Sequence, residues 1–201
     1  MKLGDDFYQR PDVVCIAREL LGKVLFTRKE REITAGIIVE TEAYEGVTDR
    51  ASHAWNGRRT KRTESMYTRG GTSYVYLCYG IHHLFNIVTN KEEIPHAILV
   101  RAVEPVEGIN LMLKRRKKSI MDYSLSSGPG SLTRALGISV KDDMGSLTGG
   151  RIWIEDRGII VKKNNLISTL RIGVDYAGEH ARWPYRFLIK DNLWVSRKVQ
   201  I

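Results

Sequence analysis

The alternation of hydrophobic and polar positions predicts short helices and short strands at the start of the chain. In residues 11–21, apolar side chains recur every three or four positions, which predicts a short helix that ends at Gly22. Residues 23–28 and 36–44 are typical of two strands, with the charged segment 29–32 as the turn between them. The N-terminal part is therefore expected to combine one helix with a pair of strands.

The next part of the chain has a different character. Residues 45–72 are rich in Arg, Thr, Gly and Ser and show no sustained helical or strand period, so we predict a long loop. A loop of this length is usually functional when it is ordered. Two β-like runs follow, residues 73–78 and 81–89, and only Tyr79 and Gly80 separate them, which predicts a tight hairpin.

The remainder of the chain continues this mixture of elements. The pattern predicts a strand at 97–103 ended by Pro105, a helix at 106–114, a sharp turn at 127–130, a helix at 132–136, and short strands at 152–154, 186–189 and 194–195. There is no internal repeat, low-complexity segment or linker. The simplest organisation is one α+β domain over residues 1–201.

Composition adds a strong charge imbalance. The 201 residues include 32 Lys and Arg against 23 Asp and Glu, a net charge of +9, in an otherwise ordinary globular composition. A basic domain of this size favours a polyanionic partner such as nucleic acid. Charge alone leaves open whether such binding is specific, and it also fits general solubility or association with ribosomes.

The cysteines and the apolar runs indicate the compartment. Cys15 and Cys78 form neither a CxxC pair nor a metal-like spacing, so both are expected to be reduced residues in or near the core. No apolar run approaches the roughly 20 residues of a membrane span, and the acidic N-terminus does not resemble a signal peptide. We therefore expect a cytoplasmic protein, associated with the nucleoid if bacterial, that does not bind membranes.

Candidate chemistry appears first in the strand at 36–44. Side chains alternate along a strand, so Glu40, Glu42 and Tyr44 share one face. Two carboxylates on a buried face are costly without partners. A solvated strand face, or a Glu40 that pairs with an arginine, explains an isolated Glu-x-Glu equally well and is the commoner case.

The predicted hairpin is rich in aromatic residues. Tyr74 and Tyr76 share one strand face, and aromatic rings provide stacking surfaces for bases. Taken singly, either tyrosine is more simply explained as a core aromatic. Tyr79 is different, because a hairpin tip is normally exposed to solvent and a large ring there can act as a wedge in a base step.

Taken together, these motifs resemble the alkyladenine (3-methyladenine, methylpurine) DNA glycosylase family. The resemblance follows the family's order over nearly the whole chain. It rests on residues 39–44 (VETEAY), 51–53 (ASH), 70–80 (GGTSYVYLCYG), 86–87 (NI), 99–105 (LVRAVEP), 127–130 (SGPG), 171–174 (RIGV), 177–179 (AGE) and 194–196 (WVS). It implies a single α+β domain with a curved, mainly antiparallel sheet, surrounding short helices and a hairpin that inserts into DNA.

The resemblance also implies site residues. In the family pattern, Glu42 matches the general base that activates water; Tyr44, His53 and Tyr76 match the walls of the pocket for the flipped base; Asn86 matches a residue that crowds the 2-amino group of guanine; Tyr79 matches the residue that fills the gap in the stack; and Arg101 matches a backbone or water contact. These roles imply a monofunctional enzyme that excises alkylated or deaminated purines from double-stranded DNA and leaves an abasic site. No metal or cofactor is implied, and a monomer is expected.

Phosphate contacts are expected from the basic residues of the long loop, namely Arg58, Arg59, Lys61, Arg62 and Arg69. The basic run 114–118 is more simply a solvated surface. One departure from the family pattern is Ser131, which stands where the family often has lysine, so a phosphate contact at this position is in doubt.

Two other functions fit parts of the sequence. A metal-dependent nuclease would use Glu40, Glu42, Asp49 and His53 as ligands for Mg²⁺. A non-catalytic DNA-bending protein would use the basic surface and Tyr79 alone. Neither explains the whole-chain order of motifs.

Overall fold

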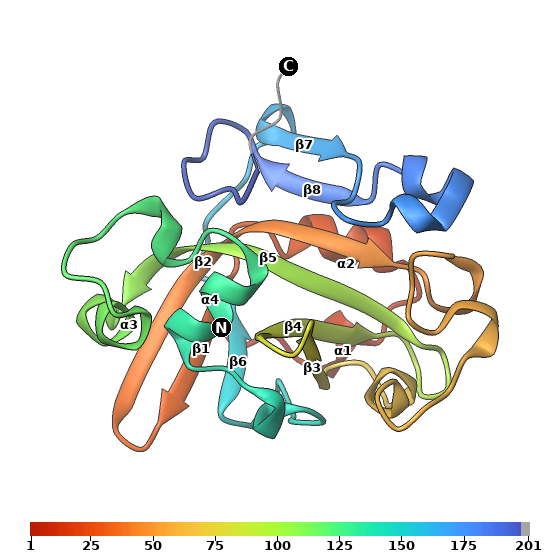
Figure 1. Ribbon diagram of the computed structural model, residues 1–201, viewed down its shortest axis with the longest axis horizontal. Coiled ribbons are helices and arrows are strands. Elements are labelled where there is room, and N and C mark those ends of the chain that lie inside the picture. Colours follow the sequence, from red (N-terminus) through yellow and green to blue (C-terminus); the bar gives the residue numbers. More distant parts are fainter. Residues whose placement is uncertain (198–201) are drawn as a thin grey trace.

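The computed structural model describes residues 1–197, and its centre is one curved antiparallel sheet (Figure 1). The sheet order is β3-β4-β5-β2-β1-β6, and β8 pairs with both β2 and β7. The strands are β1 (Val24–Lys29), β2 (Glu32–Tyr44), β3 (Ser73–Cys78), β4 (His82–Thr89), β5 (His96–Glu107), β6 (Ile152–Glu155), β7 (Leu166–Thr169) and β8 (Arg186–Ile189). The expected α+β class with a mainly antiparallel sheet is confirmed.

Short helices surround this sheet. They are α1 (Asp5–Tyr8), α2 (Val13–Glu19), α3 (Ile109–Arg116) and α4 (Pro129–Leu136), with short 3-10 segments elsewhere. Helix α2 is shorter than the predicted helix 11–21, because it begins only after Asp12, whose side chain caps it by accepting a hydrogen bond of 2.8 Å from the Cys15 N–H. A main hydrophobic core joins α2 and α4 to the central strands through residues such as Ile16, Phe85 and Leu132.

The predicted end of one strand is wrong. Pro105 was expected to end the strand that starts near residue 97, but β5 continues to Glu107 and Pro105 pairs with Gly36 of β2. On its other side β5 pairs with β4 only between His96 and Leu99, so at Pro105 it lies at an edge. Proline has no N–H to donate, and it is tolerated at such an edge because no neighbouring strand needs a donor there.

Two predicted helices are displaced for local backbone reasons. Helix α3 begins at Ile109, not at residue 106, because β5 runs on and Gly108 makes the turn with φ +72°. Helix α4 begins at Pro129, within the segment predicted as a turn, because proline is well suited to the first helical position. The segment 127–130 therefore leads directly into α4.

The C-terminal part also differs from the prediction. Residues 152–154 and 186–189 are strands as predicted, whereas residues 194–195 form no strand. Two further elements, α1 and β7, have four residues each and were not predicted. The long loop 45–72 is ordered and contains three short 3-10 helices: Gly46–Thr48, Trp55–Gly57 and Glu64–Tyr67.

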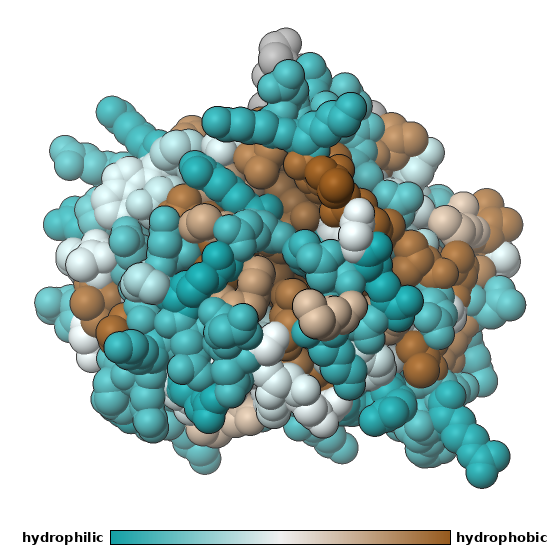
Figure 2. Space-filling view, turned by 180° about the vertical axis from the view of Figure 1, so that it is seen from behind, coloured by the Kyte–Doolittle hydropathy of each residue, from teal (hydrophilic) through white to brown (hydrophobic). Residues whose placement is uncertain are grey.

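The molecular surface is mainly polar on the side opposite to the view of Figure 1. Figure 2 shows hydrophilic residues over most of this side, with hydrophobic residues gathered in a band from the upper centre toward the right. Within residues 1–197, no helix combines the length and the apolar character needed to cross a bilayer.

Candidate active site

The candidate site begins with a row of paired residues across the sheet. Glu42 of β2 pairs with Leu99 of β5, Leu99 pairs with Asn86 of β4, and Asn86 pairs with Tyr74 of β3. Directly paired residues point to the same face of a sheet. The register therefore brings a carboxylate, an amide and a phenol, from positions 42, 86 and 74, to one face of four adjacent strands.

The carboxylate of Glu42 is buried and held by three donors. Its Oε1 accepts from the Ile172 N–H at 2.8 Å, and its Oε2 accepts from the Tyr44 hydroxyl at 2.8 Å and the Arg101 Nη1 at 3.2 Å. A carboxylate has about four acceptor sites. One acceptor site therefore remains, on Oε1, for a further donor such as water.

Arg101 is positioned by an irregularity of the sheet. The pairing of β2 with β5 passes from Glu40–Ala102 to Thr41–Val100, so Arg101 is an extra residue in a β-bulge. Its Nε donates to Glu40 Oε1 at 3.0 Å while its Nη1 contacts Glu42. The prediction that Glu40, Glu42 and Tyr44 share one face is confirmed, and Arg101 links the two carboxylates.

Glu40 has a separate set of partners. Its Oε1 also accepts from Arg186 Nε at 2.7 Å and the Ser196 hydroxyl at 2.9 Å, and its Oε2 accepts from the Ser196 N–H at 2.6 Å. The expectation that Glu40 pairs with an arginine is confirmed. Because all four donors come from the protein, Glu40 stabilises Arg101, Arg186 and the segment around Ser196.

A pocket of about 400 Å³ opens beside Glu42. Its size lies in the range of roughly 300–1,000 Å³ that is usual for small-ligand sites. Glu42 lies behind the wall that its partners Tyr44, Arg101 and Ile172 help to form. The lining includes every residue expected for the base pocket and its surroundings: Tyr44, His53, Tyr76, Asn86, Tyr79 and Arg101.

Three aromatic residues build one wall of this pocket. The rings of Tyr74 and Tyr76 stack with centroids 5.3 Å apart, and the His53 ring meets Tyr76 edge-on at 4.8 Å. His53 is oriented by a bond of 2.8 Å between its Nδ1 and the Tyr74 hydroxyl. Arg62 lies over the face of Tyr76, with 4.5 Å from its Cζ to the ring centroid. A guanidinium thus occupies a stacking position at this wall.

His53 is neutral at physiological pH. Burial, together with the positive charges of Arg62 and Arg58, lowers the pKa of His53 to about 4. Since the imidazole gains its charge only as the pH falls toward 4, it does not repel a cationic ligand near neutral pH.

The pKa of His53 provides a test of this wall. We expect a histidine titration by NMR to give a pKa of about 4 in the wild type and a higher value in Arg62→Gln, which removes a neighbouring positive charge. The value should stay below 6.5, because burial remains. Arg59→Gln is the control, since the Arg59 guanidinium is paired with Glu64 and Glu93. Equal shifts in both variants, or none in Arg62→Gln, would contradict the placement of Arg62.

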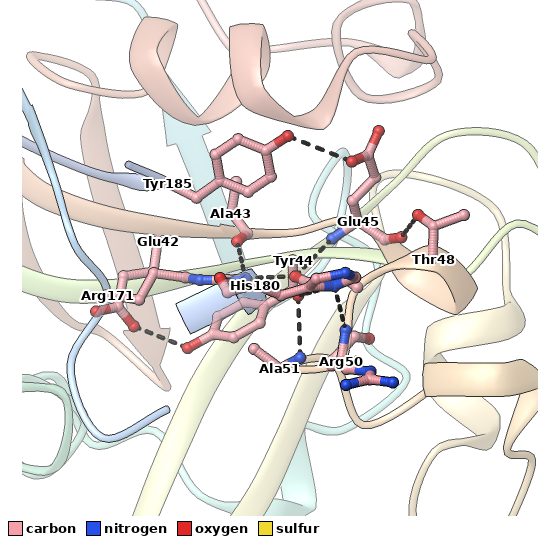
Figure 3. A network of polar contacts seen from close by, with 12 residues as sticks. Glu42, Ala43, Tyr44, Glu45, Thr48, Arg50, Ala51, Arg171, His180 and Tyr185 are labelled. Carbon is pink, nitrogen blue, oxygen red and sulfur yellow. Dashed lines mark hydrogen bonds and ion pairs between the residues drawn. The ribbon is translucent and has the colours of Figure 1, made fainter. Parts of the chain in front are cut away.

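A buried ion pair attaches the long loop to the site. Arg171 donates to both carboxylate oxygens of Asp49, to the Ala43 carbonyl at 2.9 Å and to the His180 carbonyl at 3.0 Å. Its guanidinium lies 4.9 Å from the centre of the Tyr44 ring. Figure 3 shows how Arg171, Glu42 and Tyr44 belong to one network with the loop backbone. This pair fixes the segment that precedes His53.

The network keeps Tyr44 protonated. Burial, followed by the negative charge of Glu42 and the hydrogen bond to it, raises the pKa of the Tyr44 hydroxyl well above its usual value. Tyr44 therefore remains a donor to Glu42 and a neutral part of the pocket wall.

Tyr79 lies at the tip of the β3–β4 hairpin, as predicted. Its side chain is 94% exposed, and its backbone adopts φ +49°, a left-handed conformation that places a large ring at a tight turn. The ring borders the pocket and has no packing role in the core.

The basic residues of the long loop fall into distinct groups. Arg59 and Arg69 form ion pairs, with Glu64 and Glu93 and with Asp5 respectively. Arg62 lies in the pocket wall. Arg58 and Lys61 are exposed, and within the part of the chain that the structure describes neither forms an ion pair.

The carboxylates proposed for a metal-dependent nuclease are engaged elsewhere. Glu40 and Glu42 are bound by arginines and backbone donors, and Asp49 is bound by Arg171. His53 is oriented by Tyr74. Between residues 1 and 197, no group of three or more His, Cys, Asp or Glu side chains has the geometry of a metal site. The arrangement does not favour the nuclease hypothesis.

Comparison with known proteins shows the family of this chain. The family model described as methylpurine-DNA glycosylase (MPG) matches residues 6–193. The chain belongs to the methylpurine-DNA glycosylase family. Among its relatives, each named "Putative 3-methyladenine DNA glycosylase", the protein of Chlamydia felis is 42% identical over 98% of this chain and 100% of its own length. That of Clostridium perfringens strain 13 is 44% identical, and that of Bdellovibrio bacteriovorus 42%, with the same shares covered.

Some residues of the candidate site carry no chemical signal in the sequence. Ile172 contributes a backbone N–H to Glu42, and its side chain lines the pocket with Val174 and Tyr176. The segment 171–174 was noted for its resemblance to the family, but a backbone donor has no residue-type signature. The sequence likewise does not indicate that Arg171 pairs with Asp49, which lies 122 positions earlier in the chain.

Proposed function

We propose that residues 1–201 form a single glycosylase domain that flips a damaged purine out of duplex DNA and hydrolyses its N-glycosidic bond. The observation that carries the proposal is the open acceptor site on Glu42 Oε1 beside an aromatic pocket of about 400 Å³. Family membership supports damaged DNA as the substrate. The substrates are alkylated or deaminated purines, and the protein acts as a monomer without a cofactor.

The pocket favours electron-poor bases over normal ones. A cation over an aromatic face gains roughly 0.5–2 kcal/mol, and Tyr76 and Tyr44 offer such faces. Neutral His53 adds an aromatic surface without repelling positive charge. A damaged base also stacks and pairs less well, so flipping it costs less. For a base to stack on Tyr76, the Arg62 side chain must move away from this face.

Asn86 provides a second basis for selection. It is almost fully buried, it lines the pocket, and its Nδ2 donates to the Tyr74 carbonyl at 3.1 Å. Its amide is therefore fixed in position rather than free to move away. We assign it the exclusion of normal guanine, whose 2-amino group would crowd this amide.

Glu42 performs the central chemical step. A water oxygen bonds to the anomeric carbon, the N-glycosidic bond breaks with its electron pair leaving on the base, and Glu42 Oε1 takes a proton from the water. The carboxylate also stabilises the oxocarbenium-like sugar, by analogy with glycosidases that act on O-glycosidic bonds. A cationic alkylated purine leaves as a neutral molecule, so its departure needs little acid assistance, whereas a neutral deaminated purine must take up a proton as it leaves. Because water is the nucleophile, the product is an abasic site.

Arg101 positions this chemistry. Two of its three guanidinium nitrogens contact Glu40 and Glu42, and its side chain lines the pocket. We assign it the placement of the attacking water or of a backbone phosphate beside Glu42. Arg58 and Lys61 are the loop residues best suited to phosphate contacts. Arg59, Arg62 and Arg69 would have to exchange their present contacts to make them.

Tyr79 fills the space that the flipped nucleotide leaves. Tyr79→Ser should weaken the affinity for lesion duplex roughly 5- to 150-fold, because a base–aromatic stack contributes about 1–3 kcal/mol. The measurement is a binding titration on lesion duplex and on undamaged duplex. Ile160→Ser, at a position that is 86% exposed, is the control for losing a surface hydrophobic residue. If Tyr79→Ser binds lesion duplex as the wild type does, Tyr79 is not the wedge.

The function is tested by incubating the wild type with methylated duplex DNA in the presence of EDTA and separating the released bases by chromatography. The proposal predicts free alkylated purines and abasic sites, with strand breaks only after alkali. Direct strand breaks that disappear with EDTA would support a nuclease. Tight binding with no released base would support a DNA-bending protein.

A further inference from the structure

A second cavity lies on the other side of the β3–β4 hairpin from the base pocket. It has a volume of about 680 Å³ and is lined by hairpin residues 81–83, the start of α4 and the end of α3. The two cavities share one partition, because Tyr79 and Pro129 line the base pocket while Ile81 and Gly130 line this groove. Figure 1 shows α4 beside the hairpin and α3. The hairpin tip thus separates two hollows.

The groove is strongly basic. Four cationic side chains line it, Lys29, Arg115, Arg116 and Arg134, and its lining includes no aspartate or glutamate. Within residues 1–197, none of the four forms an ion pair, since no carboxylate oxygen lies within 4.0 Å of its side-chain nitrogens. Arg59, Arg69 and Arg151, in contrast, each form at least one ion pair. We call these four residues and the cavity that they line the arginine groove.

The arginines are held in place rather than left mobile. Arg115 Nη1 donates to the Ala135 carbonyl at 3.1 Å, Arg116 Nε to the Leu125 carbonyl at 3.1 Å, and Arg134 Nε to the Arg115 carbonyl at 3.1 Å. Arg115 and Arg116 are half-buried, which differs from the solvated surface expected for the run 114–118. Burial and the nearby positive charge of Arg134 lower the pKa of Arg116. The arrangement brings like charges together, which an anion would relieve.

We propose that the arginine groove binds the sugar-phosphate backbone of the DNA strand opposite the damaged one. This inference rests on the proposed function. When Tyr79 enters the duplex, the damaged strand remains on the side of the base pocket, to which its flipped nucleotide is attached. The opposite strand then lies on the far side of the hairpin tip, where Ile81, 71% exposed, leads into the groove. Guanidinium groups form strong, charge-assisted hydrogen bonds to phosphate, and the nitrogens of Arg115, Arg116 and Arg134 that do not donate to the protein are available for such bonds.

This assignment gives the protein a reason to prefer duplex over single-stranded DNA. The base pocket and Tyr79 can engage one strand alone, whereas the arginine groove has a ligand only when the opposite strand is present. Each phosphate contact that is lost should lower the slope of log affinity against log salt by about 0.9 for duplex DNA.

The test uses paired substitutions of the two exposed cations, Lys29→Gln with Arg134→Gln. Lys162→Gln with Lys163→Gln is the matched control, because it removes the same charge from another exposed surface. Binding is measured on a duplex with a stable abasic-site analogue and on the corresponding single strand. We expect the groove variant to lose tenfold or more in affinity for the duplex, since hydrogen bonds to charged groups are strong. It should bind the single strand as the control does.

The strand assignment is tested by replacing phosphates one at a time with neutral methylphosphonates. Neutral linkages in the undamaged strand should weaken wild-type binding and should weaken binding by the groove variant less, because it keeps only Arg115 and Arg116. Sensitivity confined to the damaged strand, or equal loss of affinity for single-stranded and duplex DNA, would overturn the assignment. So would equal binding by the groove variant and its control.

The inference and the proposed function fail separately. If the wild type releases damaged bases while the groove variant binds duplex as the control does, only the assignment of the arginine groove is wrong. If the wild type releases no base from any damaged duplex, the proposed function fails, whatever the groove binds.

Discussion

Glu42→Gln is expected to slow base release about 10²–10⁴-fold, the usual contribution of a general base. Glutamine keeps the size of the side chain but removes the charge that takes a proton from water and stabilises the developing sugar cation. The three donors around position 42, from Ile172, Tyr44 and Arg101, hold the carboxylate in place. The loss should therefore appear in the chemical step, and affinity for lesion duplex should change much less.

The measurement is a single-turnover rate of base release, with affinity and thermal stability determined on the same preparations. Glu45→Gln is the matched control, since Glu45 lies three positions along the chain but does not line the pocket. It should release bases at nearly the wild-type rate. A Glu42→Gln variant that is folded, binds lesion duplex and still releases bases at the wild-type rate would remove Glu42 as the base.

Asp49→Asn is expected to lower the free energy of unfolding by roughly 3–5 kcal/mol, the cost of breaking a buried ion pair by removing one partner. The side chains of Asp49 and Arg171 are both inaccessible to solvent. Without Asp49, the Arg171 charge stays buried against the Tyr44 ring. The same change should loosen the segment before His53, so base release should fall as well.

Urea unfolding gives the comparison. Asp5→Asn is the control, because Asp5 pairs with Arg69 on an exposed surface, where an ion pair contributes at most about 1 kcal/mol. The double variant Asp49→Asn with Arg171→Met should recover part of the stability, since it no longer buries an unpaired charge. If Asp49→Asn lowers the free energy of unfolding by no more than Asp5→Asn does, the buried ion pair does not hold the loop.

The sequence predicted the elements with strong local signals. Helix α2 and strands β3, β4, β6 and β8 lie close to their predicted positions, because periodicity, capping and turn residues agree there. The end of β5 could not be predicted from the sequence. A proline ends a strand only where a neighbouring strand needs an N–H donor at that position, and the sequence does not show whether such a neighbour is present. Very short elements such as α1 depend on tertiary contacts rather than on a repeating pattern.

The candidate site was predictable where it rests on alternation and on the motifs of the family. Alternation placed Glu42 and Tyr44 on one strand face and Tyr76 on a face shared with Tyr74, whereas the roles expected of these residues came only from the resemblance to the family. What the sequence could not provide is the geometry between distant segments: the Ile172 N–H on Glu42, the bulge that aims Arg101, and the Asp49–Arg171 pair. The arginine groove could not be predicted either. A basic run on a helix is usually a solvated surface, and only the structure shows that this run lines a cavity together with α4.

The most direct test of the account is a crystal structure of Glu42→Gln bound to duplex DNA that contains one alkylated purine. We predict that the purine lies outside the duplex and stacks between Tyr76 and Tyr44, that the Tyr79 ring occupies the gap, and that a water lies between residue 42 and the anomeric carbon. A damaged base that remains stacked in the duplex, or a purine bound away from this pocket, would contradict the account.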